Sequence, residues 1–398
     1  MKKLFVTLIA AAAVCACEYG YMEGDFPAKE SDGFSYAYPD GNGGEGEPGQ
    51  GIPGVVTAAE WNDLDNWDFW GKLMTKEPDE QSQGYSSYSS EWGFWTGKRI
   101  AVKVTSDGKP AIGVKVALLD GSNEVWAAKT DNQGRADCWP GLHSKNYQTG
   151  KLSITLNGQP TEGSPAVTSW SDATVTMNEY ELKADAPKAT ADILFIVDAT
   201  GSMADEIAFL KADLMDILSR AEKTQLPVTI RTGALFYRDE EDDYLTCGSP
   251  FTQDFQTTIG FINDQDADGG GDWPEAVHTA LSVSLQEFDW DESARARIAF
   301  ILLDAPPHKD RQGVMASVHK SIDTYAKMGI KLIPVASSGV DKSLEFLLRF
   351  MAVSTGGTYV FITNDSGVGR DHIEATVGEY QVEKLGDLMV RLIQKYLE

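Results

Sequence analysis

Two of the most apolar runs in this sequence end in side chains that carry oxygen ligands. The run DILFIV is followed by Asp198, Thr200 and Ser202 at alternate positions, and the run RIAFILL is followed by Asp304. Between the two runs, Asp272 lies in GGGDWPEA, immediately before a segment with helical periodicity. Oxygen ligands, carboxylates above all, are what Mg²⁺ and Ca²⁺ bind in proteins. These five residues are therefore candidate ligands of a divalent cation.

The elements that must position these residues are visible in the hydrophobic pattern of the second half of the chain. Apolar runs of strand length predict strands at 192–197, 227–237, 297–303, 330–336 and 358–362. Helical periodicity first places Ile207, Leu210, Leu214, Ile217 and Ala221 on one face, and further helices are expected at about 274–288, 313–328, 341–353 and 381–397. Such alternation is typical of an α/β fold with a parallel sheet and helices on both faces. Ligands bind beyond the carboxyl ends of its strands, where Asp198 and Asp304 are expected.

Together, DATGSM, GGGDWPEA and DAPPH resemble the motifs of the von Willebrand factor type A (VWA) domain, as found in bacterial surface proteins and some kinase-associated proteins. That family holds a cation in a metal-ion-dependent adhesion site (MIDAS). The family's ligands are Asp-x-Ser-x-Ser after the first strand, a threonine from a middle loop and a later aspartate. The resemblance covers about half of the chain and implies a Rossmann-like VWA domain at residues 190–398. It implies the same five ligands, with Asp272 in place of the threonine, and an open coordination position for a carboxylate of a protein partner.

The aspartate at position 272 changes the expected charge of the site. Three carboxylates around one divalent ion should tighten cation binding and weaken the attraction of an acidic partner. We therefore expect Mg²⁺ or Ca²⁺, with Mn²⁺ also compatible, and Ca²⁺ is more plausible than in the threonine version. If Asp272 is not a ligand, Thr279 is the nearest substitute, although it lies well inside the helical pattern.

Other interpretations of these residues remain open. Ser202 and Asp272 could act only as helix caps, and Asp304 could be an ordinary strand-end residue. The stretch DQDADGGGDWPE also matches the calcium loop of an EF-hand, through Asp264, Asp266, Asp268, Gly269, Asp272 and Glu275. Against an EF-hand, Gly271 occupies the position that normally carries an apolar residue, and Pro274 precedes the final glutamate.

Two further features lie near the expected site in sequence. The acidic run YRDEEDDY is expected to be a solvated loop, with the alternative that Asp239 or a neighbour frames the metal site. His308 follows Asp304 closely and is expected at the surface.

The first half of the chain divides by composition. Residues 1–16 are expected to be a lipoprotein signal peptide, 17–54 a flexible tether rich in Gly, Glu and Pro, and 55–97 a Trp-rich docking segment with a polar linker. Alternating apolar residues and tight-turn sequences then predict a small antiparallel β-sandwich at 98–184. VTSDGKPAIGVKVAL followed by KTDNQGRAD resembles transthyretin-like (Ig-like in outline) or carboxypeptidase regulatory-like modules.

The opening sequence MKKLFVTLIAAAAVCAC is typical of a secretory signal that is too short to span a bilayer. VCAC resembles a bacterial lipobox with Cys17 as the lipidated residue, and an ordinary signal peptide is the alternative. Because Glu18 follows rather than aspartate, we expect an outer-membrane anchor, on the periplasmic side or at the cell surface. No later run reaches the length of a membrane helix, so lipid is the only membrane attachment expected. Cys138 and Cys247 remain, and the compartment permits a disulfide between them.

The 398-residue chain has a formal net charge of -26, which argues against nucleic acid as a partner. It contains no G-x-S-x-G, Walker A or H-E-x-x-H motif. We therefore expect a bacterial lipoprotein that is not an enzyme and binds another protein, for adhesion or complex assembly, through a divalent cation. The alternatives are an enzyme or a regulatory subunit of one, which would need a second metal ion, and a purely structural metal.

The lipid anchor can be tested directly. The substitution Cys17→Ser should abolish incorporation of labelled fatty acid and release the protein from membranes, because no other membrane attachment is expected. Unchanged fractionation of this variant with membranes would refute the lipoprotein interpretation.

Overall fold

The computed structural model describes residues 56–76, 84–223, 226–271, 273–366 and 372–398. The expected signal peptide, the tether and Cys17 lie outside the described residues, and so does Asp272. The chain divides into two compact units, Met1–Gly49 and Gln50–Glu398, and all of the described residues belong to the second.

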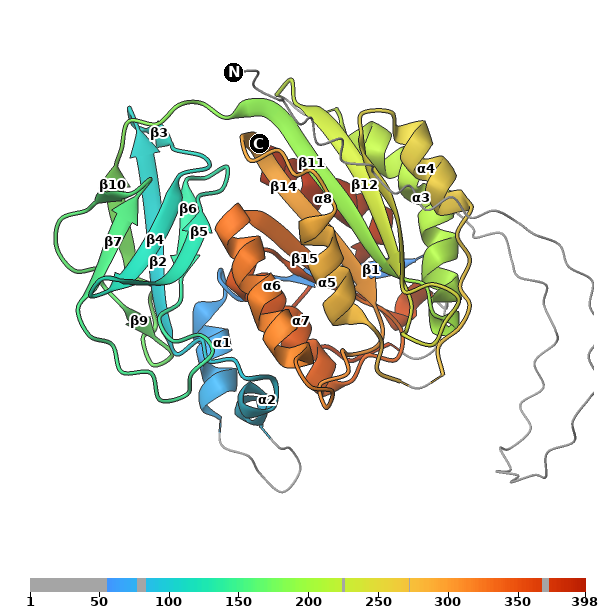
Figure 1. Ribbon diagram of the computed structural model, residues 1–398, viewed down its shortest axis with the longest axis horizontal. Coiled ribbons are helices and arrows are strands. Elements are labelled where there is room, and N and C mark those ends of the chain that lie inside the picture. Colours follow the sequence, from blue (N-terminus) through green and yellow to red (C-terminus); the bar gives the residue numbers. More distant parts are fainter. Residues whose placement is uncertain (1–55, 77–83, 224–225, 272, 367–371) are drawn as a thin grey trace, which may run out of the picture. The chain divides into compact units, whose positions relative to one another are not determined.

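A large, mostly parallel sheet forms the centre of the α/β part (Figure 1). In the described part of the chain it has eight strands, in the order β13-β12-β11-β14-β15-β16-β1-β17. The parallel strands are β11 (Lys188–Asp198), β12 (Thr229–Tyr237), β14 (Ala294–Leu303), β15 (Ile330–Ala336) and β16 (Tyr359–Ile362). They coincide with the five expected strands. The antiparallel strands are β13 (Thr246–Thr252), β1 (Thr57–Trp61) and β17 (Glu383–Lys384).

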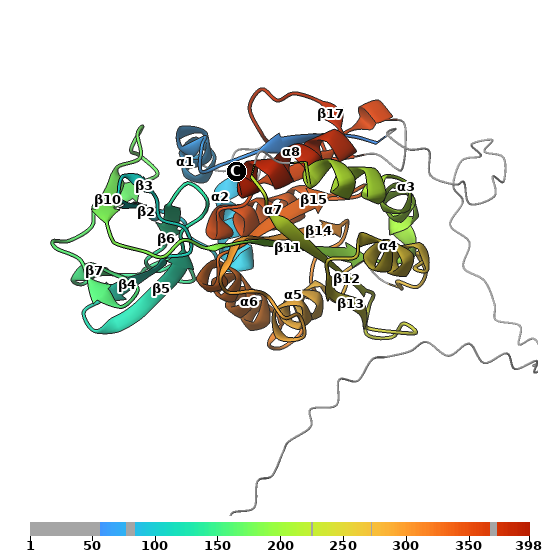
Figure 2. The ribbon, with the colours of Figure 1, turned by 90° about the horizontal axis from the view of Figure 1, so that it is seen from above.

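Helices cover both faces of the large sheet. They are α3 (Ala204–Ala221), α4 (Phe255–Asn263), α5 (Val277–Gln286), α6 (Val314–Met328), α7 (Lys342–Thr355) and α8 (Leu385–Leu397). Figure 2 shows α3 and α8 on one side of the strands and α5 and α6 on the other. The sequence did not predict α4 or β13. Strand β13 is short, polar and at the edge of the sheet, and it contains a proline, so it lacks the apolar run of the other strands.

The continuously apolar sequence of β11 follows from its burial on both faces of the sheet. Ile193, Phe195 and Val197 pack in one hydrophobic cluster with α3, α4 and α8. Leu194 and Ile196 pack in the other cluster, with α5, α6 and α7. Successive side chains of a strand point to opposite faces, so a strand covered on both faces must be apolar at every position.

Local signals set the ends of the helices around this sheet. Asp341 caps α7 by accepting a hydrogen bond from the backbone amide of Leu344 at 2.7 Å. Gly329 ends α6 with φ of 69°, a left-handed conformation that glycine adopts without strain. The chain therefore turns directly from α6 into β15.

The segment before the small sheets joins the large one. The composition of residues 55–97 predicted a segment outside the α/β domain, but β1 pairs antiparallel with β16 and so extends the large sheet. Helices α1 (Trp67–Thr75) and α2 (Tyr85–Trp92) follow it. Pairing between strands about 300 positions apart leaves no local pattern, which is why the sequence did not reveal it.

A buried ion pair fastens this segment to α7. The guanidinium of Arg349 is fully buried and donates two hydrogen bonds to the carboxylate of Asp63, at 2.9 and 2.6 Å. The indole of Trp61 donates to the same carboxylate at 2.9 Å, and Arg349 also donates to the carbonyl of Thr376 at 2.5 Å. Several partners thus satisfy two charges that would be costly to bury alone.

Strands β2 to β10 form two small sheets, which we call the small-sheet region. One contains β2 (Lys98–Ser106), β3 (Lys109–Pro110), β6 (Arg135–Cys138), β9 (Thr168–Ser169) and β10 (Met177–Glu181). The other contains β4 (Lys115–Asp120), β5 (Asn123–Lys129), β7 (Leu152–Leu156) and β8 (Gln159–Pro160). Contrary to the expected antiparallel arrangement, β10 pairs with β2 in parallel, because it returns by a long connection rather than a hairpin.

Two other features bear on the expectations. Cys138 on β6 and Cys247 on β13 form no disulfide with each other. None of the helices in the described ranges is both long and apolar enough to cross a membrane.

The buried ion pair yields a stability prediction. Arg349→Ala should lower the free energy of unfolding by about 3–5 kcal/mol, because it leaves the Asp63 carboxylate buried and unpaired. Arg391→Ala is the matched control, since Arg391 forms exposed ion pairs with Glu60 and Glu383 and should cost no more than about 1 kcal/mol. Urea denaturation measures both. Equal losses in the two variants would show that the pair does not fasten β1 and α1 to α7.

Candidate metal site

The register of the large sheet brings the two expected aspartates to one edge. β11 and β14 are parallel neighbours, and their pairing runs to Val197 opposite Leu302. Asp198 is the last residue of β11, and Asp304 directly follows β14. Both carboxylates therefore leave neighbouring strands at the carboxyl edge, as the sequence predicts.

The turn after β11 gathers the first three expected ligands. The Oδ1 atom of Asp198 accepts hydrogen bonds from the backbone amide of Thr200 at 2.9 Å and from its hydroxyl at 2.7 Å. A short 3₁₀ turn, Gly201–Met203, follows and places the Ser202 hydroxyl 3.5 Å from that of Thr200. No side-chain capping bond starts α3, so Ser202 is not a helix cap here.

A cavity of about 430 Å³ opens at this edge. Its lining includes Thr200, Ser202, Glu275 and Asp304. Asp198 is fully buried, and its carboxylate interacts with the hydroxyl of Tyr237 as well as with Thr200, which lines the cavity. The structure thus brings together four of the five expected residues, while the fifth, Asp272, lies outside the described residues.

Glu275 is the residue that the metal-site interpretation missed. Its backbone amide donates to the carbonyl of Pro306 at 2.9 Å, which fixes it beside the loop after β14. Its side chain is buried next to Gly270, which also adjoins Thr200, and its Oε2 atom has no hydrogen-bond partner among the described residues. The sequence signal was weak: Glu275 appeared only as the last position of the EF-hand match.

Burial and mutual repulsion shift the acids of this edge. Burial, followed by the charge of Asp304, raises the pKa of Asp198 to about 7, against the opposing hydrogen bonds from Thr200 and from the hydroxyl of Tyr237. Burial, followed by Asp198, Asp239, Asp242 and Asp304, raises the pKa of Glu275 to about 9. Each carboxylate thus makes its neighbours harder to ionise.

The glycine run of GGGDWPEA folds tightly over the cavity. Gly269 and Gly270 have φ of 80° and 78°, which other residues rarely adopt. The backbone amide of Gly270 donates to the carboxylate of Asp242 at 3.1 Å, and a side chain on Gly269 would collide with that carboxylate. Gly201 donates to the carbonyl of Gly269 at 3.2 Å, which joins this loop to the turn after β11.

The acidic loop after β12 is partly buried rather than wholly solvated. Asp239 is buried and bonds the Nε2 atom of His308 at 2.7 Å. His308 is also buried, so the expectation of a surface histidine was wrong. Asp242 accepts a hydrogen bond from the backbone amide of Asp239 at 3.0 Å. Its carboxylate also accepts from Gly270, so the acidic loop positions the glycine run. Only the folded chain brings Asp239 and His308 together.

The contacts of the EF-hand match favour the sheet-edge interpretation. Asp264 ends α4, and the exposed carboxylate of Asp266 pairs with Lys211 at 2.8 Å. Glu275 lies beside Gly270, which also adjoins Thr200, and the acids that raise its pKa are Asp198, Asp239, Asp242 and Asp304. Thr279, the alternative ligand, contacts His278 at 3.4 Å and does not line the cavity.

The residues present fit a hard divalent cation, because Asp198, Glu275 and Asp304 are neighbouring buried carboxylates, burial and mutual charge raise the pKa values of Asp198 and Glu275, and two hydroxyls lie next to them. Within the described ranges, no group of three or more His, Cys, Asp and Glu side chains could hold a metal ion by itself. Hydroxyl groups or water would therefore have to complete any coordination sphere.

Known proteins are similar to the α/β part of this chain. Residues 192–333 match the family model described as von Willebrand factor A domain. The chain is 34% identical over 203 residues to an ariadne-like RING finger protein of Acanthamoeba polyphaga mimivirus, covering 47% of this chain and 20% of that protein. It is 28% identical over 170 residues to the alpha-protein kinase vwkA of Dictyostelium discoideum, covering 42% and 26%. The chain thus matches only about a fifth to a quarter of the length of these relatives.

Two solved structures also align with the chain. The conserved hypothetical protein BatB from Bacteroides thetaiotaomicron aligns at 12% identity with a TM-score of 0.28, covering 52% of this chain and 85% of that one. Proximal thread matrix protein 1 from the mussel byssus aligns at 17% identity with a TM-score of 0.35, covering 52% and 46%. At these TM-scores the two alignments support no conclusion about the function of this chain.

Proposed function

We propose that this VWA-domain protein binds another protein through a divalent cation held at the carboxyl edge of its large sheet. One observation carries the proposal. At an open cavity, the buried carboxylate of Glu275 has an oxygen without a hydrogen-bond partner in the described part of the chain, and the hydroxyls of Thr200 and Ser202 lie in the same lining. The fully buried carboxylate of Asp198 adjoins this lining through its hydrogen bonds from Thr200. A cation would offset the repulsion among these acids.

The ligands of the proposed site are the oxygens of Asp198, Thr200, Ser202, Asp304 and Glu275. Because no three of the described acids could hold an ion together, at least one of the three carboxylates would act through water. Asp272 remains a candidate on the sequence alone. A third carboxylate makes the site more negative than one with a threonine, which should favour tight binding of Mg²⁺ or Ca²⁺, or of Mn²⁺. The cation would then supply an open coordination position for a carboxylate of the partner.

Binding rather than catalysis is the role that we propose for this edge. The relatives' names describe a kinase and a RING finger protein, but the chain matches only 26% and 20% of those proteins. An enzyme that uses metal ions for hydrolysis commonly needs a second ion about 4 Å from the first, for which Asp239 would be the source. Asp239 already bonds His308, which favours a single ion.

An exposed aromatic side chain marks where the partner would lie. Trp273 is 49% exposed and lines the metal-site cavity and a neighbouring one of about 390 Å³. The neighbouring cavity is also lined by Trp92, Pro306 and Pro307. Exposed tryptophans beside a polar site often carry much of the binding energy of an interface. The lipid on Cys17 and the tether would hold this surface near the outer membrane.

The cation site is tested by titration with Mg²⁺, Ca²⁺ and Mn²⁺ in a calorimeter. Asp198→Ala should eliminate binding while the domain stays folded, and Asp304→Ala should weaken binding at least about 10–100-fold, the range known for outer-shell changes. Glu275→Gln should weaken it about tenfold, because one carboxylate is lost.

The matched control for these variants is the double substitution Asp264→Ala with Asp266→Ala, which should leave affinity unchanged. If the double variant lost affinity and Asp304→Ala did not, the cation would be bound by an EF-hand loop at residues 264–275. Binding of two ions would favour the enzyme, and unfolding on chelation would favour a structural metal.

The partner surface is tested by Trp273→Ala. This variant should retain cation affinity but lose at least about tenfold in affinity for any partner that the intact protein captures in Mg²⁺ and releases in EDTA. Tyr380→Ala, which removes another exposed aromatic ring, is the control and should change neither quantity. Undiminished partner affinity in Trp273→Ala would show that the partner does not contact this surface.

A further inference from the structure

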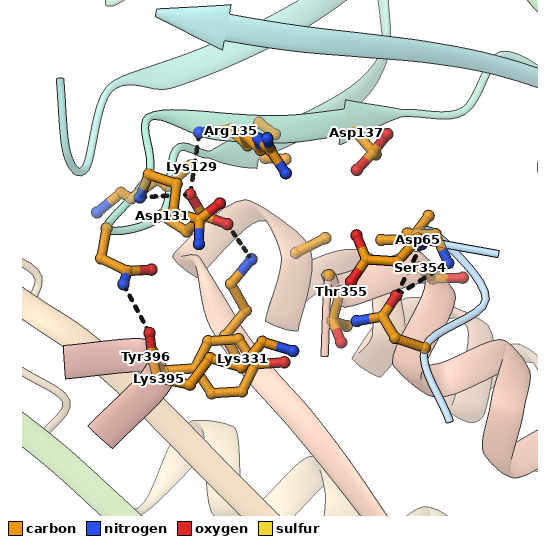
Figure 3. A pocket seen from close by; sticks show the side chains of 18 of the residues that line it. Asp65, Lys129, Asp131, Arg135, Asp137, Lys331, Ser354, Thr355, Lys395 and Tyr396 are labelled. Atoms are coloured by element: carbon orange, nitrogen blue, oxygen red, sulfur yellow. Dashed lines mark hydrogen bonds and ion pairs between the residues drawn. The ribbon is translucent and has the colours of Figure 1, made fainter. Parts of the chain in front are cut away.

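A second cavity, of about 240 Å³, lies between the small-sheet region and the α/β part (Figure 3). Its walls come from residues 128–137 on one side and from the ends of α7 and α8 and the start of β15 on the other. Lys331, near the first residue of β15, lies at the amino edge of the large sheet. The cavity is therefore at the opposite edge from the candidate metal site.

The wall from the small-sheet region is fixed in place. The Oδ1 atom of Asp131 accepts two backbone amide hydrogen bonds of its own turn, each at 2.9 Å, and its Oδ2 atom pairs with Lys331 at 3.3 Å. The side-chain amide of Asn132 donates to the carbonyl of Lys395 at 2.8 Å. Because the turn at Asp131 and Asn132 is bonded to both β15 and α8, the two walls of the cavity are held at a fixed separation.

Cations gather on one side of this cavity. Figure 3 shows Lys129, Arg135, Lys331 and Lys395 there, around Asp131. Lys331 is paired with Asp131 and Lys129 with Glu292, at 3.3 and 3.8 Å, whereas the guanidinium of Arg135 and the ammonium of Lys395 form no ion pair with any described residue. Burial, followed by the like charge of Arg297, lowers the pKa of Lys129. In a chain with a net charge of -26, this concentration of cations is suited to an anion.

The other side of the cavity offers groups that bind hydroxyls. Figure 3 shows Asp65, Asp137, Ser354 and Thr355 there. Asp137 is held by Arg99 at 2.6 Å, while the exposed carboxylate of Asp65 forms no ion pair in the described ranges. Ser354 is only 2% exposed, and its hydroxyl has no hydrogen-bond partner among the described residues. A buried hydroxyl normally has a partner, and a ligand in this cavity is one group that could supply it.

We propose that this cavity binds a small hydroxylated organic anion, of the class of sugar phosphates and sugar acids. The anionic group would lie against Arg135, Lys395 and Lys129, and the hydroxyls against Ser354 and Asp65. The volume is below the ~300–1,000 Å³ of pockets for drug-sized ligands, which limits the ligand to about a single ring. Because both parts of the chain form the walls, a bound ligand would hold them together.

The test uses the mature chain in the presence of EDTA, so that phosphate cannot report on a cation at the other edge of the sheet. Glucose 6-phosphate and gluconate are the charged probes, and glucose is the uncharged control. At least one charged probe should raise the melting temperature and bind at least about tenfold more tightly than glucose, with affinity that falls as salt rises. Whichever binds more tightly identifies phosphate or carboxylate. No binding of either probe, or equal binding of glucose, would overturn the proposal.

Variants locate the binding to this cavity. Arg135→Gln with Lys395→Gln should weaken binding of the charged probe at least about tenfold, because charge-assisted hydrogen bonds are lost. Ser354→Ala should weaken it several-fold without lowering the melting temperature of the ligand-free protein, because that hydroxyl has no partner to lose among the described residues. Lys109→Gln, which neutralises an exposed lysine on β3, is the control and should bind as the unmodified chain does. Undiminished binding in the double variant would place the ligand elsewhere.

Discussion

The in-register parallel pairing of β11 with β14 is the constraint on which the candidate metal site depends. Both strands are apolar on both faces because helices cover both faces of the sheet. A slip by one residue would turn every side chain of a strand to the opposite helix layer, so core packing selects a single register. That register ends the strands together and brings Asp198 and Asp304 to the same edge. The packing of the core thereby determines where the carboxylates lie.

The carboxyl edge of the sheet buries acidic side chains at a cost to the stability of the fold. Burying a carboxylate is costly, and Asp198 is fully buried beside other acids, while Glu275 carries a buried oxygen without a hydrogen-bond partner in the described part of the chain. Their raised pKa values express that cost. The glycine run and Asp242 nevertheless hold the loop closely over them. Where a fold maintains such a cost to its own stability, function is the usual reason, and a divalent cation would offset the cost here.

The cavities at the two edges of the large sheet differ in the charged residues that line them. Acids gather at the carboxyl edge, while Lys331 and its neighbours line the cavity at the amino edge. The second arrangement exists because β1 and the ion pair between Asp63 and Arg349 hold the N-terminal segment against the α/β part, with the small-sheet region inserted between β1 and β11. The chain thus presents two separate polar surfaces, one suited to a cation and one to an anion.

The sequence by itself determined the parallel core and the strand-end residues of the candidate site. Continuous apolar runs and strand-end residues are local patterns, so β11, β14, Asp198, Thr200, Ser202 and Asp304 could all be found from them. Tertiary structure alone decided that Glu275 joins these residues, that His308 bonds Asp239 and that β1 extends the sheet. Each of these depends on contacts between segments distant in sequence, and such contacts leave no periodic trace in the chain. The polar cavity likewise exists only where two such segments meet, because residues of both form its walls.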